Sequence, residues 1–172
     1  METDGMHRRD FLRNTVAVGA LAAGGAVIFG PDHAWALSTT SLDPHTAKTL
    51  LAVAHELFPH DRLGMQYYAA VVEAVDKDAA GNPELRKLLV EGVARLDAGH
   101  GIPFAELSEG ARTAALQKIE GTEFFTTMRS KTINALYGNP RVYGMFGFEG
   151  SSVEYGGYLH RGFDDIGWLP ND

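Results

Sequence analysis

The first candidate for a chemical site is the pair His55-Glu56, which is followed by His60. A helical zinc-protease motif needs its second histidine four residues after the first, so that both imidazoles share one helix face. His60 is five residues on and lies beyond Pro59, which ends a helix. The spacing therefore favours a surface pair at a helix end over a zinc site.

Asp97 and His100 form the second candidate, because carboxylate-bridged metal pairs in helical bundles use Glu-x-x-His motifs. Such a centre needs the motif on two helices and two further inward carboxylates, whereas Asp97-x-x-His100 occurs once, where a helix is expected to end. We interpret it as a polar helix end. The glycines of residues 144–150 resemble a phosphate loop, but neither a clear strand nor a helix flanks them as that motif requires.

His160 lies close to Asp164 and Asp165 near the end of the sequence. Such groups could serve in acid–base catalysis if burial shifted their pKa values. We favour the interpretation that they hydrogen-bond to backbone amides in a loop or pair across an interface. A free-standing periplasmic enzyme using His160 with Asp164 or Asp165 therefore remains the alternative to a binding protein.

The composition excludes several classes of protein. The chain has 172 residues, 45% of them apolar, a net charge of −7 and no cysteine. Disulfides, thiolate zinc sites, iron–sulfur clusters and haem attached through C-x-x-C-H are therefore excluded. An acidic chain without a basic stripe also argues against binding to nucleic acid.

The first 36 residues resemble a bacterial twin-arginine export signal, with paired arginines, a weakly apolar run over 15–30 and a small-x-small cleavage site. The motif residues are Arg8, Arg9, Phe11 and Leu12, and the cleavage-site residues are Ala34 and Ala36. An N-terminal membrane anchor is the alternative, although the run is shorter than the ~20 residues that span a bilayer. Cleavage after Ala36 is expected to make the mature chain periplasmic. Because this route carries folded proteins, and mostly those that have acquired a cofactor, the signal could also serve a bound, cofactor-loaded partner.

The apolar periodicity and the helix boundary signals predict an all-α fold in which four to five helices form a small bundle over residues 37–137. Residues 37–42 are expected to be a polar lead-in, Asp43-Pro44 to start the first helix, and Gly138 to end the last one in a left-handed conformation. The expected helices cover residues 43–58, 65–80, 84–98, 109–120 and 123–137.

Residues 138–172 are predicted to form a long irregular arm, because they contain eight glycines and seven aromatic residues without helical or strand periodicity. Aromatic residues, Met and Arg are enriched at the cores of protein interfaces. We therefore expect a docking arm, in which Tyr143, Phe146 and Phe148 are best placed to pack on the bundle and residues 155–168 are the better candidates for contact with the partner. The expected partner-binding residues are Tyr143, Phe146, Phe148, Tyr155, Gly156, Gly157, Tyr158, Arg161, Phe163, Asp164, Trp168 and Pro170.

The order of these features resembles the small subunit, of the subunit 3 type, of bacterial gluconate and related sugar or alcohol dehydrogenases. The resemblance covers most of the chain and rests on short motifs. They are Arg8-Arg9-x-Phe11-Leu12, Leu57-Phe58-Pro59, Glu123-Phe124-Phe125, Asn139-Pro140, Tyr155-Gly156-Gly157 and Gly167-Trp168. Tyr158 stands where that family usually has Asn, and Leu169-Pro170 replaces a Pro-Gly after the tryptophan.

The resemblance implies a non-catalytic subunit that binds no cofactor or metal itself. Its expected partner is a large FAD-bearing dehydrogenase of the glucose–methanol–choline type without an export signal of its own, and electrons would pass on to a multihaem cytochrome c. The small subunit would stabilise the flavoprotein and carry it out of the cytoplasm.

Overall fold

The computed structural model describes residues 16–20, 26–30, 35–153, 156–157 and 159. In these ranges the chain is mainly helical, which confirms the predicted all-α class. The helices are α2 (Pro44–Leu57), α3 (Met65–Ala80), α4 (Pro83–Ala98), α5 (Glu109–Lys118), α6 (Glu123–Tyr137) and α7 (Pro140–Met145), with a 3-10 turn η2 (Phe104–Glu106).

The helix boundaries follow local capping chemistry. The Asp43 carboxylate accepts hydrogen bonds from the backbone N–H groups of His45 and Thr46, and Pro44 occupies the first helical position. Asn82 and Pro83 start α4 in the same way, and the Thr122 hydroxyl caps α6. These polar groups satisfy helix N–H groups that would otherwise lack partners, which is why the predicted boundaries agree closely with the observed ones.

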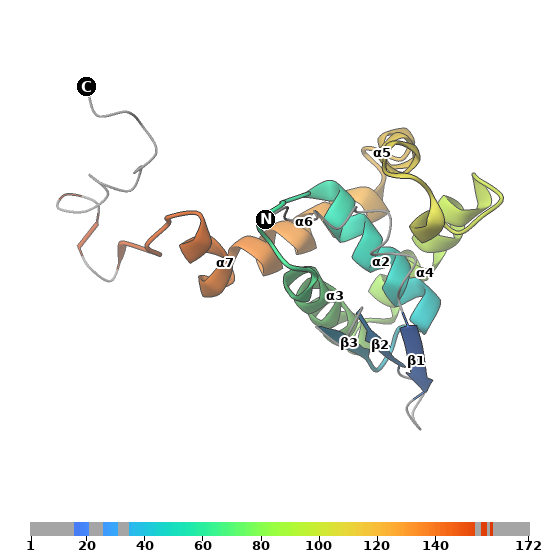
Figure 1. Cartoon of the computed structure of the whole chain (residues 1–172), viewed down its shortest axis with the longest axis horizontal. Helices are drawn as coiled ribbons and strands as arrows, with labels where there is room; N and C mark the ends of the chain where they lie inside the picture. The colour runs from blue at the N-terminus through green and yellow to red at the C-terminus, as the bar shows by residue number, and fades with distance from the viewer. Residues whose placement is uncertain (1–15, 21–25, 31–34, 154–155, 158, 160–172) are drawn as a thin grey trace, which may run out of the picture.

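The bundle is organised around α2, which contacts α3, α4, α5 and α6 (Figure 1). Its core contains Leu50 and Val53 from α2, Tyr68 from α3, Leu89 from α4 and Met128 from α6. On α6, Phe124 is buried, whereas the neighbouring Phe125 is only partly buried.

A three-stranded antiparallel sheet, in the order β1-β2-β3, lies beside the helices and was not predicted (Figure 1). Its strands are β1 (Val16–Ala20), β2 (Ala26–Phe29) and β3 (Ala36–Thr39), and β3 packs on α3. The prediction of a polar lead-in over 37–42 is therefore wrong at its start. Exposed and buried residues alternate along β3, with Leu37 and Thr39 buried, and four residues are too few for that pattern to be recognised in a sequence.

The carboxylate of Asp76 on α3 holds the chain that follows β3. It accepts hydrogen bonds from the backbone N–H groups of Thr40, Ser41 and Leu42 at 2.7–3.0 Å, and from the hydroxyls of Thr40 and Ser41. Burial raises the pKa of Asp76, but these hydrogen bonds outweigh it and leave the pKa below its usual value. Asp76 therefore fixes the start of the helical bundle.

Two predictions for the start of the arm are wrong. Gly138 has φ −76° and ψ −8°, a right-handed rather than left-handed conformation. A side chain there would collide with the carbonyl oxygen of Asn134, so close approach accounts for the glycine. Asn139 and Pro140 do not keep the chain irregular but start the short helix α7, with the Asn139 side chain accepting from Arg141 N–H.

Candidate functional site

Helix α7 lies beyond the end of α6, outside the bundle of α2 to α6 (Figure 1). Val142, in its middle, is fully buried and anchors the helix. After α7 the chain turns back, and Phe148 N–H donates to the Tyr143 carbonyl at 3.0 Å. The start of the arm is therefore an ordered structure built on the last helix of the bundle.

A cluster of rings joins α7 to the bundle. The His60 Nε2 and Tyr137 Oη atoms lie 2.5 Å apart in a hydrogen bond. The Phe146 ring centroid lies 5.1 Å from that of His60 and 6.4 Å from that of Tyr137, and Phe58 packs edge-on against Tyr137 at 5.8 Å. Burial raises the pKa of the Tyr137 phenol, which keeps it protonated and able to donate. Phe146 is thus held from one side.

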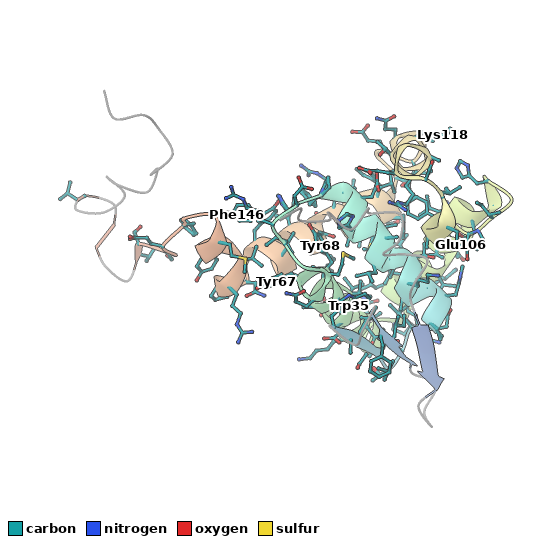
Figure 2. The ribbon with its side chains drawn as sticks, viewed as in Figure 1. Trp35, Tyr67, Tyr68, Glu106, Lys118 and Phe146 are labelled. Carbon is teal, nitrogen blue, oxygen red and sulfur yellow. The ribbon has the colours of Figure 1, made fainter. Side chains whose placement is uncertain are left out.

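Apolar side chains next to this cluster face solvent. Met145, Phe146 and Phe148 are 46%, 47% and 44% exposed, and we call these three residues the α7 apolar face. Tyr143 is partly buried and packs edge-on against Phe148, with ring centroids 5.4 Å apart. Figure 2 shows Phe146 on the α7 side of the molecule, away from Trp35 and the sheet. Neighbouring exposed apolar residues of this kind are typical of surfaces that bind another protein.

Glu56 is part of a buried ion pair, so its interpretation as a surface residue is wrong. Its carboxylate accepts from Arg112 Nε at 3.0 Å and from the Thr113 hydroxyl, and both charged side chains are only 7% exposed. Arg112 also donates to the carbonyl of Leu107. Since these contacts join α2 to the start of α5, they are structural.

The remaining chemical candidates also have structural partners. His55 packs edge-on against the ring of Tyr68. Asp97 accepts from Phe104 N–H at 2.8 Å and pairs with His45 Nε2 at 2.6 Å, so it does form a polar helix end. Within the described ranges, no three His, Asp or Glu side chains are arranged to hold a metal ion.

A groove of about 390 Å³ lies between the first turns of α4 and α6. Its lining combines Leu85 and Leu88 with Glu84, Glu91 and Glu123. The predicted partner-binding residues do not line it, so it is separate from the α7 apolar face.

Many of the predicted site residues lie outside the described residues. Gly156 and Gly157 are described and have φ 81° and 92°, a backbone conformation that favours glycine. Ala36 lies in β3. The residues outside the described ranges are Arg8, Arg9, Phe11, Leu12, Ala34, Tyr155, Tyr158, His160, Arg161, Phe163, Asp164, Asp165, Trp168 and Pro170.

Sequence reasoning missed the supporting residues of the site. His60 and Tyr137 are 77 residues apart, and no local pattern signals their contact. Met145 could have been included, because it stands between the predicted Tyr143 and Phe146 and methionine is common in interfaces.

The described part of the chain is a small helical protein that exposes an apolar face on α7. Within the described ranges no helix is both long and apolar enough to cross a membrane. The model of the family gluconate 2-dehydrogenase subunit 3 matches residues 44–150, more than half of the chain. The chain therefore belongs to this family, whose name describes a subunit of a dehydrogenase complex. No curated protein and no solved structure gives a significant match.

Proposed function

We propose that this chain is the non-catalytic small subunit that binds, stabilises and co-exports a large FAD-dependent dehydrogenase of the glucose–methanol–choline type. The partner would act on a sugar, a sugar acid or an alcohol. Membership of the gluconate 2-dehydrogenase subunit 3 family over residues 44–150 is the observation that carries this proposal. FAD belongs to the partner in this scheme, and a multihaem cytochrome c would be a further partner that receives the electrons.

The α7 apolar face is the part of the described surface best suited to hold the large subunit. It lies inside the matched range and exposes two phenylalanines and a methionine. Buried Val142 and the contacts of Phe146 with His60 and Tyr137 fix the face before any partner arrives. A preorganised surface loses less conformational entropy on binding, which favours affinity.

The residues that come after the α7 apolar face in the sequence would extend the docking surface along the partner. Tyr155, Tyr158, Phe163 and Trp168 supply aromatic side chains, and Arg161, Asp164 and Pro170 accompany them. Gly156 and Gly157 would let the backbone follow a foreign surface closely. The mature complex would be periplasmic, with the paired arginines of this chain directing its export.

Co-expression with the large subunit tests the proposal. The flavoprotein is expected in the periplasm with the wild-type chain and in the cytoplasm when Arg8 and Arg9 are both replaced by lysine. A variant with Arg13→Lys, which leaves the arginine pair intact, is the matched control. Normal export of the flavoprotein with the paired-lysine variant would refute co-export. Turnover by the purified chain alone, lost in His160→Ala, would instead favour the free-standing enzyme.

A further inference from the structure

The predicted export leader contributes two strands to the folded chain. β2 runs antiparallel to β3, with Val27 opposite Ser38, Ile28 opposite Leu37 and Phe29 opposite Ala36. Gly30 N–H also donates to the carbonyl of Trp35 at 2.9 Å. The sheet of β1, β2 and β3 lies along one side of the helices (Figure 1). Part of the apolar run and the bond after Ala36 are therefore inside one sheet.

Buried side chains hold β2 and β3 in place. Ile28 and its partner Leu37 are 2% and 0% exposed and belong to the core that the helices form. Trp35, next to the predicted cleavage site, is 8% exposed. Its indole lies so close to Gly30 that a side chain at position 30 would collide with it. The residues on each side of Ala36 are thus fixed by packing as well as by strand pairing.

The other edge of β3 is also occupied. Ser38 N–H, which points away from β2, donates to Glu73 Oε1 on α3 at 2.9 Å. Directly after β3, the Asp76 carboxylate binds three consecutive backbone N–H groups, from Thr40 to Leu42. A peptidase needs an accessible, extended backbone, and such backbone is exposed only when the local structure opens. The folded chain therefore protects the bond after Ala36.

We propose that part of the export leader is held in the folded chain as strand β2, so that cleavage after Ala36 requires the β2–β3 hairpin to open. The inference rests on the proposed function, because it takes residues 1–36 to be a cleaved leader. The groups that anchor β3 all lie beyond the cleavage point. They are the buried side chain of Leu37 and the carboxylates of Glu73 and Asp76, which accept backbone hydrogen bonds from β3 and the segment after it. Opening would thus release β1 and β2 while the start of the bundle stays anchored.

A disulfide across the hairpin tests this directly, because the natural chain has no cysteine. The hydrogen bond from Gly30 N–H to the Trp35 carbonyl makes these two residues a hydrogen-bonded pair. Because hydrogen-bonded and non-hydrogen-bonded pairs alternate along antiparallel strands, Val27 and Ser38 are a non-hydrogen-bonded pair. The Cα atoms of such pairs lie about 4.5 Å apart, within disulfide range. The double variant V27C/S38C of the full chain is expected to form an intramolecular disulfide on mild oxidation.

The oxidised double variant is then compared with its own reduced form during digestion by purified bacterial signal peptidase. Cleavage after Ala36 is followed on reducing gels, because the disulfide spans the cut. We expect the oxidised form to be cleaved ~10-fold more slowly or worse, since the locked hairpin cannot open locally. The single variants V27C and S38C are expected to be cleaved at the wild-type rate under both conditions.

Equal cleavage rates for the oxidised and reduced forms would overturn the inference. Failure of the folded double variant to form the disulfide would overturn it as well. Absence of cleavage in both forms would show that the leader is not processed and would also reject it. None of these results decides whether the flavoprotein depends on Arg8 and Arg9 for export, so the two proposals fail separately.

Discussion

The imidazole of His60 is hydrogen-bonded to the phenol of Tyr137, with Nε2 and Oη 2.5 Å apart. The bond joins the loop after α2 to the last turn of α6, 77 residues further along the chain. Phe146 packs on both rings, so the pair that joins the loop after α2 to the end of α6 also supports the α7 apolar face.

Tyr137→Phe removes the hydroxyl and keeps the ring that packs against Phe58 and Phe146. The free energy of unfolding is expected to fall by about 1 kcal/mol, the usual net contribution of one hydrogen bond. Urea denaturation measures this. Tyr67→Phe, on a partly buried tyrosine of α3, is the control for loss of a tyrosine hydroxyl elsewhere. An unchanged midpoint for Tyr137→Phe would mean that the hydrogen bond contributes nothing.

Phe146→Ala and Phe148→Ala are expected to weaken the complex with the large subunit by about 2 kcal/mol or more each, because truncation of a buried aromatic anchor removes its contacts with the partner. Binding is measured by titration calorimetry with the purified partner. Ile102→Ala is the matched control, since Ile102 is 49% exposed but lies in the loop before η2. Wild-type affinity of both phenylalanine variants would exclude the α7 apolar face as the docking surface.

The sequence predicted the helical part of the fold well because its information is local. Asp43-Pro44, Asn82-Pro83 and Thr122 mark helix starts by chemistry that acts within a few residues. The strands were missed because β2 and β3 have four residues each and are stabilised by pairing with each other and by packing. Such contacts connect residues that no periodic pattern relates.

The candidate site was predicted in part for the same reason. Phe146 and Phe148 stood out by composition as aromatic residues in a glycine-rich segment, but they were judged best placed to pack on the bundle, whereas the structure leaves them 47% and 44% exposed. Their support by His60 depends on a contact between distant elements. The burial of Glu56 was missed because only the fold brings Arg112 to it.

Asp76→Asn tests the clamp on the segment after β3. At pH 7 it is expected to lower the free energy of unfolding by about 1–3 kcal/mol, because buried hydrogen bonds to a charged acceptor are weakened. The pKa of Asp76 in the folded protein lies below its usual value of 3.8, so its carboxylate stabilises the fold above that pH. This contribution is lost as the pH falls through the lowered pKa.

The difference in stability between wild type and Asp76→Asn is therefore expected to shrink as the pH is lowered from 5 towards 3. Urea midpoints at a series of pH values measure it. Asp78→Asn, on the same helix with a half-exposed side chain paired to Lys131, is the control and should change little. A difference that stays constant across this range would contradict the assignment of a lowered pKa to Asp76.

Glu56→Ala leaves the Arg112 guanidinium buried without its carboxylate partner. Loss of one partner of a buried ion pair costs about 3–5 kcal/mol, so a large drop in the denaturation midpoint is expected. The double variant Glu56→Leu/Arg112→Met, which buries no charge, should recover much of this loss. Lys131→Ala, which breaks a partly exposed pair, is expected to cost less than about 1 kcal/mol. Equal effects of the two single variants would argue against a buried pair.

Gly92 on α4 lies directly against the ring of Phe124 on α6, and a side chain at position 92 would collide with that ring. Gly110 at the start of α5 is exposed, and a side chain there would meet nothing within 4 Å. Glycine to alanine normally stabilises a helix by roughly 0.5–1 kcal/mol, which is the change expected for Gly110→Ala. At Gly92 the same substitution must displace a buried ring between two helices, and overpacking of this kind costs about 1–3 kcal/mol.

The midpoints of thermal and urea denaturation of the two variants should therefore shift in opposite directions. The double variant Gly92→Ala/Phe124→Leu should recover part of the loss, because the smaller side chain makes room for the added methyl group. Stabilisation by Gly92→Ala would show that α4 and α6 do not approach as closely as this contact requires.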